Sequence, residues 1–399
     1  MNAQEVTERM EKKRFTKRDW FEVSDVATIA SPTLLVYRER VEENLRRMVK
    51  MAGDVHRLRP HIKTHKMREM IELQLGLGIT KFKCATIAEA EMAASAGVPD
   101  LLVAYQLVGP NVKRFAQLVR AFPKTKFSVI CDDAGAVGEL ARAMKPLTPA
   151  LSPSDGERGK NTHGSIEVLV DMDVGQHRTG VAAGPKAVAL YRFIAASTGL
   201  KPGGLHAYDG HISDSDPVTR TAACDAAFAS VTALRRELVE AGLTVPRIVA
   251  GGTPTFPIHA RRPEVECSPG TCVFWDSSYG SRLHDMDFLP AALVLTRVIS
   301  KLGPNRICLD LGHKALASEM PHPRVQFLNL PDSQAVVHSE EHLVVETAQA
   351  SEFNIGDCLY GIPRHICPTV ALHSTAVVIE NGKTAGFWKV AARDRRLTI

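Results

Sequence analysis

The chain lacks the long apolar runs that membrane proteins need. None of its 399 residues forms part of a hydrophobic stretch approaching the ~18 residues required to cross a bilayer. The N-terminal sequence MNAQEVTERMEKKRF is charged and contains no apolar segment of the kind found in secretory signals. With 45% hydrophobic and 23% charged residues, the composition is that of a soluble globular protein. We therefore expect a cytoplasmic protein with no membrane partner.

Closely spaced cysteines and concentrated positive charge are also missing. The eight cysteines are scattered without a CxxC pair, which argues against a disulfide framework and against a structural zinc finger. The formal net charge of +5 is small for this length, and no block rich in Lys and Arg with interleaved aromatic residues occurs. Nucleic acid is therefore not expected as a partner, whereas small anionic ligands are compatible with the sequence.

Short apolar runs alternate with helical patterns over most of the chain, which is typical of βα units around a parallel sheet. Helices are predicted, for example, over residues 87–96, where Thr86 and Glu89 form a capping box at the start, and over residues 221–241. The predicted strands cover residues 56–63, 81–86, 101–105, 126–132, 165–174, 204–210, 247–253 and 265–271. Eight is the number of strands that closes a barrel, so the sequence predicts an α/β fold, a TIM-type (β/α)₈ barrel.

A barrel of about 250 residues leaves a second domain to be accounted for. From about residue 274 the pattern changes to short alternating runs separated by Gly, Pro and Asn, which predicts a β-rich C-terminal domain over 274–399. The barrel is assigned to 31–273, with a loop insertion at 146–163, and residues 1–30 are expected to pack on the C-terminal domain.

The octapeptide RPHIKTHK, residues 59–66, is the most informative stretch. It places Lys63 between His61 and His65 and close to Lys66, at the end of the first predicted strand. A neighbouring cation disfavours the ammonium form of lysine, and a neutral lysine amine can form a Schiff base. On composition alone, the octapeptide could equally be a solvated basic loop.

Further distinctive residues follow the later strands, where the chemistry of a (β/α)₈ barrel is located. Arg178 follows the fifth strand and could either form an ion pair with Asp171 or Asp173 or bind an anionic ligand. Tyr208 and His211 lie around the end of the sixth strand in HAYDGH. Lone tyrosines and histidines are more often structural than catalytic.

The sequence GGTPT, residues 251–255, follows the seventh strand. Gly251, Gly252 and Thr253 offer backbone N–H groups with little side-chain bulk, which a phosphate cradle needs, although glycine pairs also make ordinary turns.

Near the C-terminus, His365 and Cys367 stand two residues apart in PRHICPT. Residues i and i+2 of a strand share a face, so an imidazole and a thiolate could converge on one metal ion. Two ligands alone do not define a metal site, and a buried cysteine beside a capped histidine is the alternative.

Taken together, these segments resemble the D-threonine aldolase and D-serine dehydratase family of fold-type III pyridoxal phosphate enzymes, related at the barrel to alanine racemase. The resemblance covers nearly the whole chain. It implies that Lys63 holds the cofactor, that Arg178 contacts its ring hydroxyl, and that Tyr208 lies against it. It also implies a phosphate turn at residues 251–255 and a metal pair at His365 and Cys367.

The resemblance implies a lyase that uses pyridoxal 5′-phosphate and a divalent metal (Mn, Mg or Zn) to act on a small β-hydroxy D-amino acid, as a homodimer. We favour retro-aldol cleavage of D-threonine to glycine and acetaldehyde. D-serine or 3-hydroxy-D-aspartate dehydratase, an amino-acid racemase and a cofactor-binding protein without turnover are the alternatives. Cys367 at the second ligand position is a feature of the dehydratase branch, and its softness favours zinc. His211, or else Asp214, is the candidate base at the β-hydroxyl.

Overall fold

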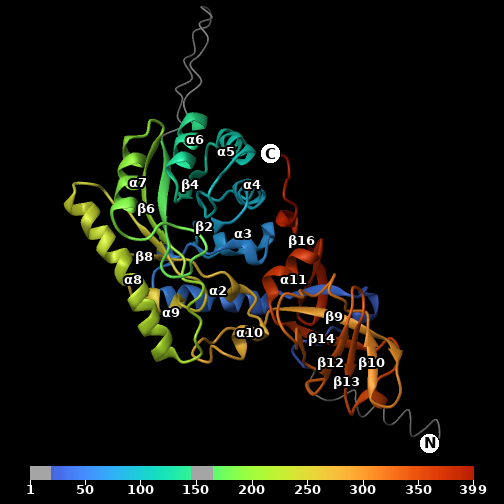
Figure 1. The fold of residues 1–399 in the computed structure, drawn as a ribbon. Coiled ribbons are helices and arrows are strands. Elements are labelled where there is room, and N and C mark those ends of the chain that lie inside the picture. Colours follow the sequence, from blue (N-terminus) through green and yellow to red (C-terminus); the bar gives the residue numbers. More distant parts are fainter. Residues whose placement is uncertain (1–18, 145–164) are drawn as a thin grey trace, which may run out of the picture.

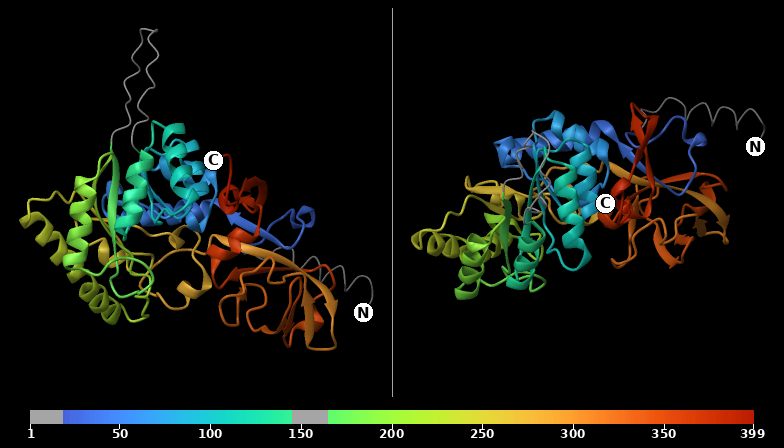
Figure 2. Two further views of the ribbon diagram at one scale, coloured as in Figure 1. Left: turned by 45° about the horizontal axis from the view of Figure 1, so that its top comes forward. Right: turned by 90° about the horizontal axis from the view of Figure 1, so that it is seen from above.

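The computed structural model describes residues 19–144 and 165–399. The predicted insertion at 146–163 and the first 18 residues of the predicted N-terminal segment lie outside these ranges. The described chain forms two bodies that lie side by side, a parallel barrel with its surrounding helices and a mostly antiparallel C-terminal domain (Figures 1 and 2). No helix within the described ranges is long and apolar enough to span a bilayer.

The first body is built on one parallel sheet of seven strands. Its strands follow chain order: β2 (Lys81–Cys84), β3 (Asp100–Val103), β4 (Lys126–Cys131), β5 (Ile166–Met172), β6 (Leu200–Ala207), β7 (Ile248–Ala250) and β8 (Val265–Cys267). The connecting helices cover its outer surface (Figure 1): α3 (Arg68–Gly76), α4 (Ile87–Ser95), α5 (Pro110–Ala121), α6 (Ala134–Met144), α7 (Pro185–Ala196), α8 (Pro217–Glu240) and α9 (Phe256–His259). The predicted barrel class is thus confirmed, with seven of the eight strands regular.

The first predicted strand, residues 56–63, was wrong as a strand. The segment forms two 3₁₀ turns, η3 (Val55–Arg57) and η4 (Ile62–Thr64). Two isolated bridges connect it to the neighbouring strands, one from Leu58 to Cys267 in β8 and one from His61 to Lys83 in β2. Because Pro60 has no N–H to donate, the ladder of hydrogen bonds cannot continue through it. The segment still fills the gap between β8 and β2, and it places Lys63 on a turn.

The second body is a nine-stranded sheet. Its strands are β1 (Thr33–Tyr37), β9 (Ala292–Lys301), β10 (Arg306–Leu309), β11 (Val325–Phe327), β12 (Gln334–His338), β13 (Leu343–Glu346), β14 (Cys358–Pro363), β15 (Thr375–Glu380) and β16 (Lys383–Lys389). Short helical turns complete the described chain: η2 (Val26–Thr28), η5 (Thr271–Val273), α10 (Ser277–Gly280), η6 (Ala350–Glu352), α11 (Ile366–Leu372) and η7 (Ala391–Arg393).

Strand β1 corrects the predicted start of the barrel at residue 31. It pairs with β9 and β15 and so belongs to the C-terminal sheet, and the chain enters the barrel only through α2 (Arg38–Ala52). Leu34 and Val36 pack into the core shared with the barrel, whereas Leu35 and Tyr37 pack into a core of the C-terminal domain. A strand buried on both faces reads as a continuous apolar run, and such a run does not reveal which sheet it joins.

Both ends of the described chain tie the two bodies together. Phe21 and Val23 pack into the C-terminal domain, where the Val23 amide donates to the hydroxyl of Tyr360. The last residues return to the barrel, where Arg114 donates to the Ile399 carbonyl at 2.8 and 3.1 Å. The C-terminal domain is therefore fixed against the barrel helices.

Local capping chemistry fixes the helices that follow the strands. Thr86 accepts a hydrogen bond from the Glu89 amide at 3.1 Å at the start of α4, as its sequence predicts. Helix α8 begins at Pro217, four residues before the predicted start, because Asp216 caps it and a proline suits the first helical position.

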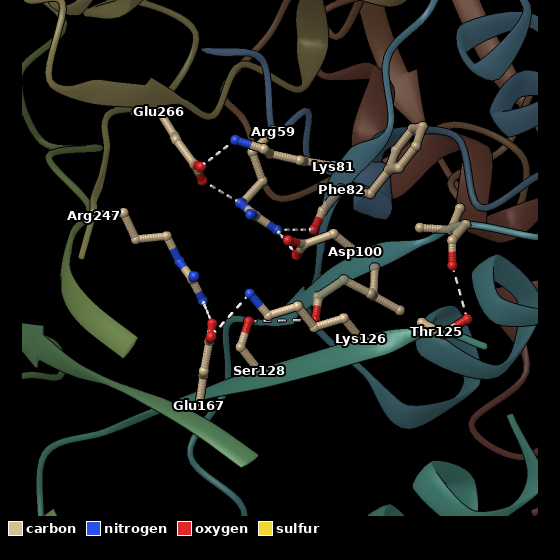
Figure 3. Close-up of polar contacts among 12 residues, drawn as sticks. Arg59, Lys81, Phe82, Asp100, Thr125, Lys126, Ser128, Glu167, Arg247 and Glu266 are labelled. Atoms are coloured by element: carbon tan, nitrogen blue, oxygen red, sulfur yellow. Dashed lines mark hydrogen bonds and ion pairs between the residues drawn. The ribbon is translucent and has the colours of Figure 1, made fainter. Parts of the chain in front are cut away.

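The end of the barrel opposite to the strand C-termini is closed by paired charges (Figure 3). Arg59, which is completely buried, binds Glu266 and Asp100 at 2.7 Å each, and Lys81 binds Glu266 at 2.6 Å. We call this set the charged floor; its members are Arg59, Lys81, Asp100, Lys126, Glu167, Arg247 and Glu266. Each cation of the floor has a carboxylate partner.

Candidate active site

A pocket lies above the charged floor, at the C-terminal ends of the strands. It is lined by residues from the Lys63 turn, from β2 to β6 and from the loops that follow β5 and β6: His61, Lys63, Lys83, Ala104, Ile130, Asp171, Met172, Asp173, Gln176, Arg178, Thr179, His206 and Tyr208. Three of the residues singled out in the sequence, Lys63, Arg178 and Tyr208, are therefore brought together in one cavity.

The ring of Tyr208 is surrounded by cations. The Nζ atoms of Lys63 and Lys83 lie 5.5 and 5.7 Å from its centroid, and the guanidinium carbon of Arg178 lies 5.0 Å from it. These distances are typical of cation–π contacts. The pocket therefore carries concentrated positive charge around one aromatic ring.

Arg178 does not form the ion pair that the sequence left open. Asp171 instead binds the Nδ1 of His206 at 2.6 Å and the Thr179 hydroxyl at 3.0 Å. Asp173 accepts hydrogen bonds from the backbone of its own loop, including the His177 amide at 3.0 Å. No carboxylate within the described residues pairs with Arg178, so its guanidinium group is available to a ligand.

The imidazoles of the pocket are held in the neutral form. Burial, followed by the nearby charge of Lys63, places the pKa of His61 well below its usual range. Burial also lowers the pKa of His206, although its hydrogen bond to Asp171 acts in the opposite direction. The Nε2 atom of His206 is buried and has no hydrogen-bond partner within the described chain, so it can serve a polar atom of a ligand.

The turn at residues 251–255 packs directly against Tyr208. Gly251 has a φ of +81°, and a Cβ at that position would lie 2.6 Å from the Cδ2 of His259. A Cβ on Gly252 would lie 3.1 Å from the Cε2 of Tyr208. Thr253 accepts hydrogen bonds from the Thr271 and Gly270 amides at 3.0 and 3.2 Å. Gly251 therefore has no room for a side chain, and a Cβ at position 252 would press on the Tyr208 ring.

A buried network that the sequence did not predict supports this turn. Asp209 accepts hydrogen bonds from the Thr255 hydroxyl and from the Nε2 of His259, both at 2.8 Å, and Arg262 donates to the Nδ1 of His259 at 2.6 Å. Ligand atoms of Asp209, His259 and Cys224 lie within 4.8 Å of one another, close enough to hold a metal ion. Because Arg262, His259 and Asp209 already form a chain of hydrogen bonds that ends at Thr255, the same network can also fix the turn without a metal ion.

His365 and Cys367 do not lie on a strand, which corrects the predicted geometry. The chain turns after β14, so that His365 is the residue preceding α11 and Cys367 lies in its first turn. The two side chains nevertheless meet. Their mutual hydrogen bond overcomes the effect of burial, so that the pKa of the Cys367 thiol is lowered and that of His365 is raised. An imidazole and a cysteine sulfur therefore face one another, and the Nδ1 of His365 binds Glu319 at 2.6 Å.

This pair lies beside the Lys63 turn. The Sγ of Cys367 is 3.2 Å from the Oγ1 of Thr64, the residue that follows Lys63, and 3.6 Å from the Oγ1 of Thr271. A candidate metal site of the C-terminal domain and a candidate cofactor lysine of the barrel are therefore adjacent.

His211 and Asp214 are not brought into the pocket. Both are exposed, and both line a separate depression next to Val174 and Thr219. The sequence predicted His211 at the end of the sixth strand, with Asp214 as an alternative base, whereas neither residue lines the pocket that contains Lys63.

Lys83 is the pocket residue that sequence reasoning missed. In the strand KFKC, Lys81 and Lys83 alternate with Phe82 and Cys84. Alternating side chains of a strand point to opposite faces, and the outer face of a barrel strand is covered by helices. The alternation could therefore have shown that both lysines point into the barrel.

A parallel barrel joined to an antiparallel domain, with a lysine pocket at the strand C-termini, defines the class of alanine racemase-like proteins. The family model "Alanine racemase, N-terminal domain" matches residues 36–278, and the model "Putative serine dehydratase domain" matches residues 291–379. The chain belongs to the alanine racemase N-terminal domain family, in the branch that carries a serine dehydratase-like domain.

Curated relatives span nearly the whole chain. The D-threonine aldolase of Arthrobacter sp. is 30% identical over 376 residues, which cover 92% of this chain and 94% of the relative. The 3-hydroxy-D-aspartate aldolase of Paracoccus denitrificans (strain Pd 1222) is 30% identical and covers 93% of this chain and 94% of the relative. The D-threo-3-hydroxyaspartate dehydratase of Delftia sp. (strain HT23) is 28% identical over 62% of each chain. The solved structure of D-threonine aldolase from Filomicrobium marinum matches with a TM-score of 0.82 at 26% identity, covering 94% of this chain and 99% of that one.

Proposed function

We propose that this chain is a lyase dependent on pyridoxal 5′-phosphate and a divalent metal, which cleaves small β-hydroxy D-amino acids by a retro-aldol reaction. D-threonine would give glycine and acetaldehyde. The proposal is supported by the aldolases among its relatives, one named for D-threonine and one for 3-hydroxy-D-aspartate. It is also supported by the cationic pocket, which suits an anionic cofactor.

Within this proposal, the residues of the pocket divide the binding of the cofactor. Lys63 would hold it through its amine, Arg178 would face its ring oxygen, Tyr208 would lie against the ring, and residues 251–253 would receive the phosphate. Pyridoxal phosphate supplies an aldehyde for the amine and an electron sink for the bond that is broken. The two glycines and the unpaired guanidinium of Arg178 fit these tasks.

His365 and Cys367 are proposed to hold the divalent metal. An imidazole together with a cysteine sulfur is a donor set suited to zinc more than to manganese or magnesium. When bound, such an ion polarises the substrate's β-hydroxyl group. Glu319 holds the Nδ1 of His365, so the Nε2 would be the ligand atom, after it has lost its proton to make room for the ion.

The observation that carries the proposal is the 3.2 Å contact between the Cys367 Sγ and the Thr64 Oγ1. It puts the proposed metal pair one residue away from Lys63, so that the Cα and the β-hydroxyl of one small substrate can be served together. Without this contact, the two motifs would belong to separate domains with no common chemistry.

Product identification tests the proposal. Purified protein supplied with the cofactor, Zn²⁺ or Mn²⁺, and D-threonine should yield glycine and acetaldehyde, and L-threonine serves as the control. Formation of 2-oxobutanoate and ammonia instead would reject the aldolase.

Dehydratase activity is the second candidate, and Cys367 favours it through the resemblance of its metal segment to the dehydratase branch. In that reaction Lys63 would take the proton from Cα and the β-hydroxyl group would leave. Assays of glycine and of keto acid in the same reaction mixture, with D-threonine and 3-hydroxy-D-aspartate as substrates, separate the two reactions.

The group that takes the β-hydroxyl proton is proposed to be His211, with Asp214 as the alternative. Their position outside the pocket requires the substrate end of the site to extend toward them. Comparison of His211→Asn with Asp214→Asn tests this assignment: the true base should lose kcat, by about 10²-fold, while KM changes little. Equal activities of both variants and the wild type would remove both residues from the reaction.

We also propose a cytoplasmic homodimer. Enzymes of this fold class commonly form their site between two subunits. Light scattering of the purified protein should give twice the chain mass of 43.5 kDa.

A further inference from the structure

Lys83 has no function in the scheme above, yet it is one of the most buried charged residues of the chain. Its side chain is 1% exposed and lines the pocket, and its strand β2 lies directly beside the segment that carries Lys63. Its Nζ forms no hydrogen bond or ion pair with any described residue, and it lies 5.7 Å from the centroid of the Tyr208 ring. A buried ammonium group without a counter-ion is costly, so this arrangement calls for an explanation.

Lys81, two residues earlier, gives a direct contrast. It points to the same side of β2 and binds Glu266 of the charged floor at 2.6 Å (Figure 3). The carboxylates near Lys83 are already engaged: Asp171 with His206 and Thr179, and Asp209 with Thr255 and His259. The strand thus supplies one lysine with a protein partner and one without.

The surroundings of Lys83 lower the pKa of its amine. Burial, followed by the charge of Lys63, lowers the pKa of the Lys83 amine to about 7. The charged and titratable groups that face it are Lys63, Arg59, Arg178, Asp171, Asp209, His61 and His206. The two aspartates raise the pKa of Lys83 and the neighbouring cations lower it. An anion added to the pocket would raise this pKa further and so favour the protonated amine.

We propose that Lys83 binds an anionic group of the ligand of this pocket, and that ligand binding protonates its amine. This inference rests on the proposed function, since the ligand is taken to be the phosphorylated pyridine cofactor. The anionic group can be the ring oxygen or the phosphate. The phosphate turn lies after β7, whereas Lys83 lies on β2 beside Lys63, so we assign Lys83 to the ring oxygen.

Proton uptake on binding tests the proposal without any turnover. Pyridoxine 5′-phosphate has the ring, the oxygen and the phosphate but no aldehyde, so it cannot bond to Lys63. Its binding to the cofactor-free protein at pH 8 would be followed by titration calorimetry in buffers of different ionisation enthalpy. At this pH an amine with a pKa about 7 is mostly neutral, so the wild type should take up close to about one proton per site.

Three variants make the result specific. Lys83→Met should bind more weakly and lose this proton uptake. Lys83→Arg, which is permanently charged, should bind without uptake. Lys81→Met, the matched control from the charged floor, should take up as many protons as the wild type. Circular dichroism of each variant checks that it is folded.

Two ligand arms identify the anionic group. Pyridoxine, which lacks the phosphate, should retain the proton uptake that depends on Lys83, whereas uptake only with inorganic phosphate would move the partner to the phosphate. Uptake by Lys83→Met equal to that of the wild type would overturn the inference alone. Failure of the wild type to bind pyridoxine 5′-phosphate would overturn the proposed function as well.

Discussion

The two ends of the barrel interior treat charge in opposite ways. In the charged floor, Arg59 is completely buried and binds two carboxylates, and Lys81 shares one of them. At the pocket end, the cationic groups of Lys83 and Arg178 have no carboxylate partner among the described residues. Both ends are made by the same strands and lie within one barrel.

The difference separates structure from function. A set of buried charges that are paired with one another closes the barrel, whereas buried cations without such partners are costly unless a ligand supplies the counter-charge. We interpret the paired end as structural and the unpaired end as the place where an anionic ligand binds.

Replacement of Lys63 should have the largest effect. Lys63→Ala removes the amine proposed to hold the cofactor, so the ~420 nm absorption band of a lysine-bound cofactor should disappear. Lyase activity should fall by about 10³-fold or more. Absorption spectra and initial rates are the measurements. Lys81→Ala, in the charged floor, is the control that should keep the band. A band that persists in Lys63→Ala would place the attachment at another lysine, such as Lys83.

Breaking the charged floor should destabilise the fold without touching the pocket. Arg59→Met leaves Asp100 without its ion-pair partner and Glu266 with Lys81 alone, and should lower the free energy of unfolding by about 3–5 kcal/mol. Urea denaturation followed by circular dichroism measures this change. Arg306→Met, which breaks the exposed pair with Glu346, should cost less than about 1 kcal/mol. Equal losses in the two variants would contradict the structural role of the floor.

Removal of Lys83 should stabilise the cofactor-free protein, whereas removal of Arg59 should destabilise it. Folding lowers the pKa of Lys83 to about 7, so the unfolded chain binds a proton at this residue more readily than the folded chain does. Lys83 therefore destabilises the fold increasingly as the pH falls from the pKa of a free lysine toward 7, and this destabilisation disappears as the pH rises again. The cofactor-free Lys83→Met variant should therefore be more stable than the wild type at pH 7, by up to a few kcal/mol at about 1.4 kcal/mol per pH unit. The difference should vanish near pH 10. Thermal melts across this pH range decide it, and a variant less stable at pH 7 would contradict the unpaired state.

The metal pair at the edge of the pocket should give the smallest of these effects. Cys367→Ser replaces a thiolate ligand by a hydroxyl group, and metal content and activity should fall together, by about 10–100-fold in metal affinity. Competition with a chromophoric chelator measures the affinity. Cys358→Ser, at a half-buried cysteine of the same domain, is the control. Activity that survives both this change and chelation would remove the metal from the reaction.

Part of this architecture could be predicted from the sequence because its signals are local. Most of the strands were found because parallel strands buried on both faces read as apolar runs, although β2 alternates lysine with apolar residues, and the start of α4 followed from the Thr86 cap. The irregular segment before Lys63 was missed because its apolar and basic residues resemble a strand end, although Pro60 prevents a regular ladder. Likewise, β1 reads as the start of the barrel, and only its pairing with β9 and β15 assigns it to the other sheet.

The site shows the same division. The motifs identified Lys63, Arg178, Tyr208 and the turn at 251–255, because each has a distinctive local composition. The strand geometry expected for His365 and Cys367 was wrong, yet the turn into α11 still brings their side chains together. The alternation of Lys81 and Lys83 with apolar residues could have shown that Lys83 points into the barrel. That Lys83 has no carboxylate partner could not be predicted from the sequence.

By itself, the sequence determined the family, the barrel class and the lysine segment, since these depend on residue types at short spacing. The tertiary structure alone decided which charges are matched. It brought Arg59 of the first barrel segment to Glu266 of β8 and Asp100 of β3, and it placed Cys367 beside Thr64 across about three hundred residues of chain. The physical reason is that the energy of a buried charge depends on its neighbours in space, and those neighbours are chosen by the closure of the barrel and the docking of the second domain.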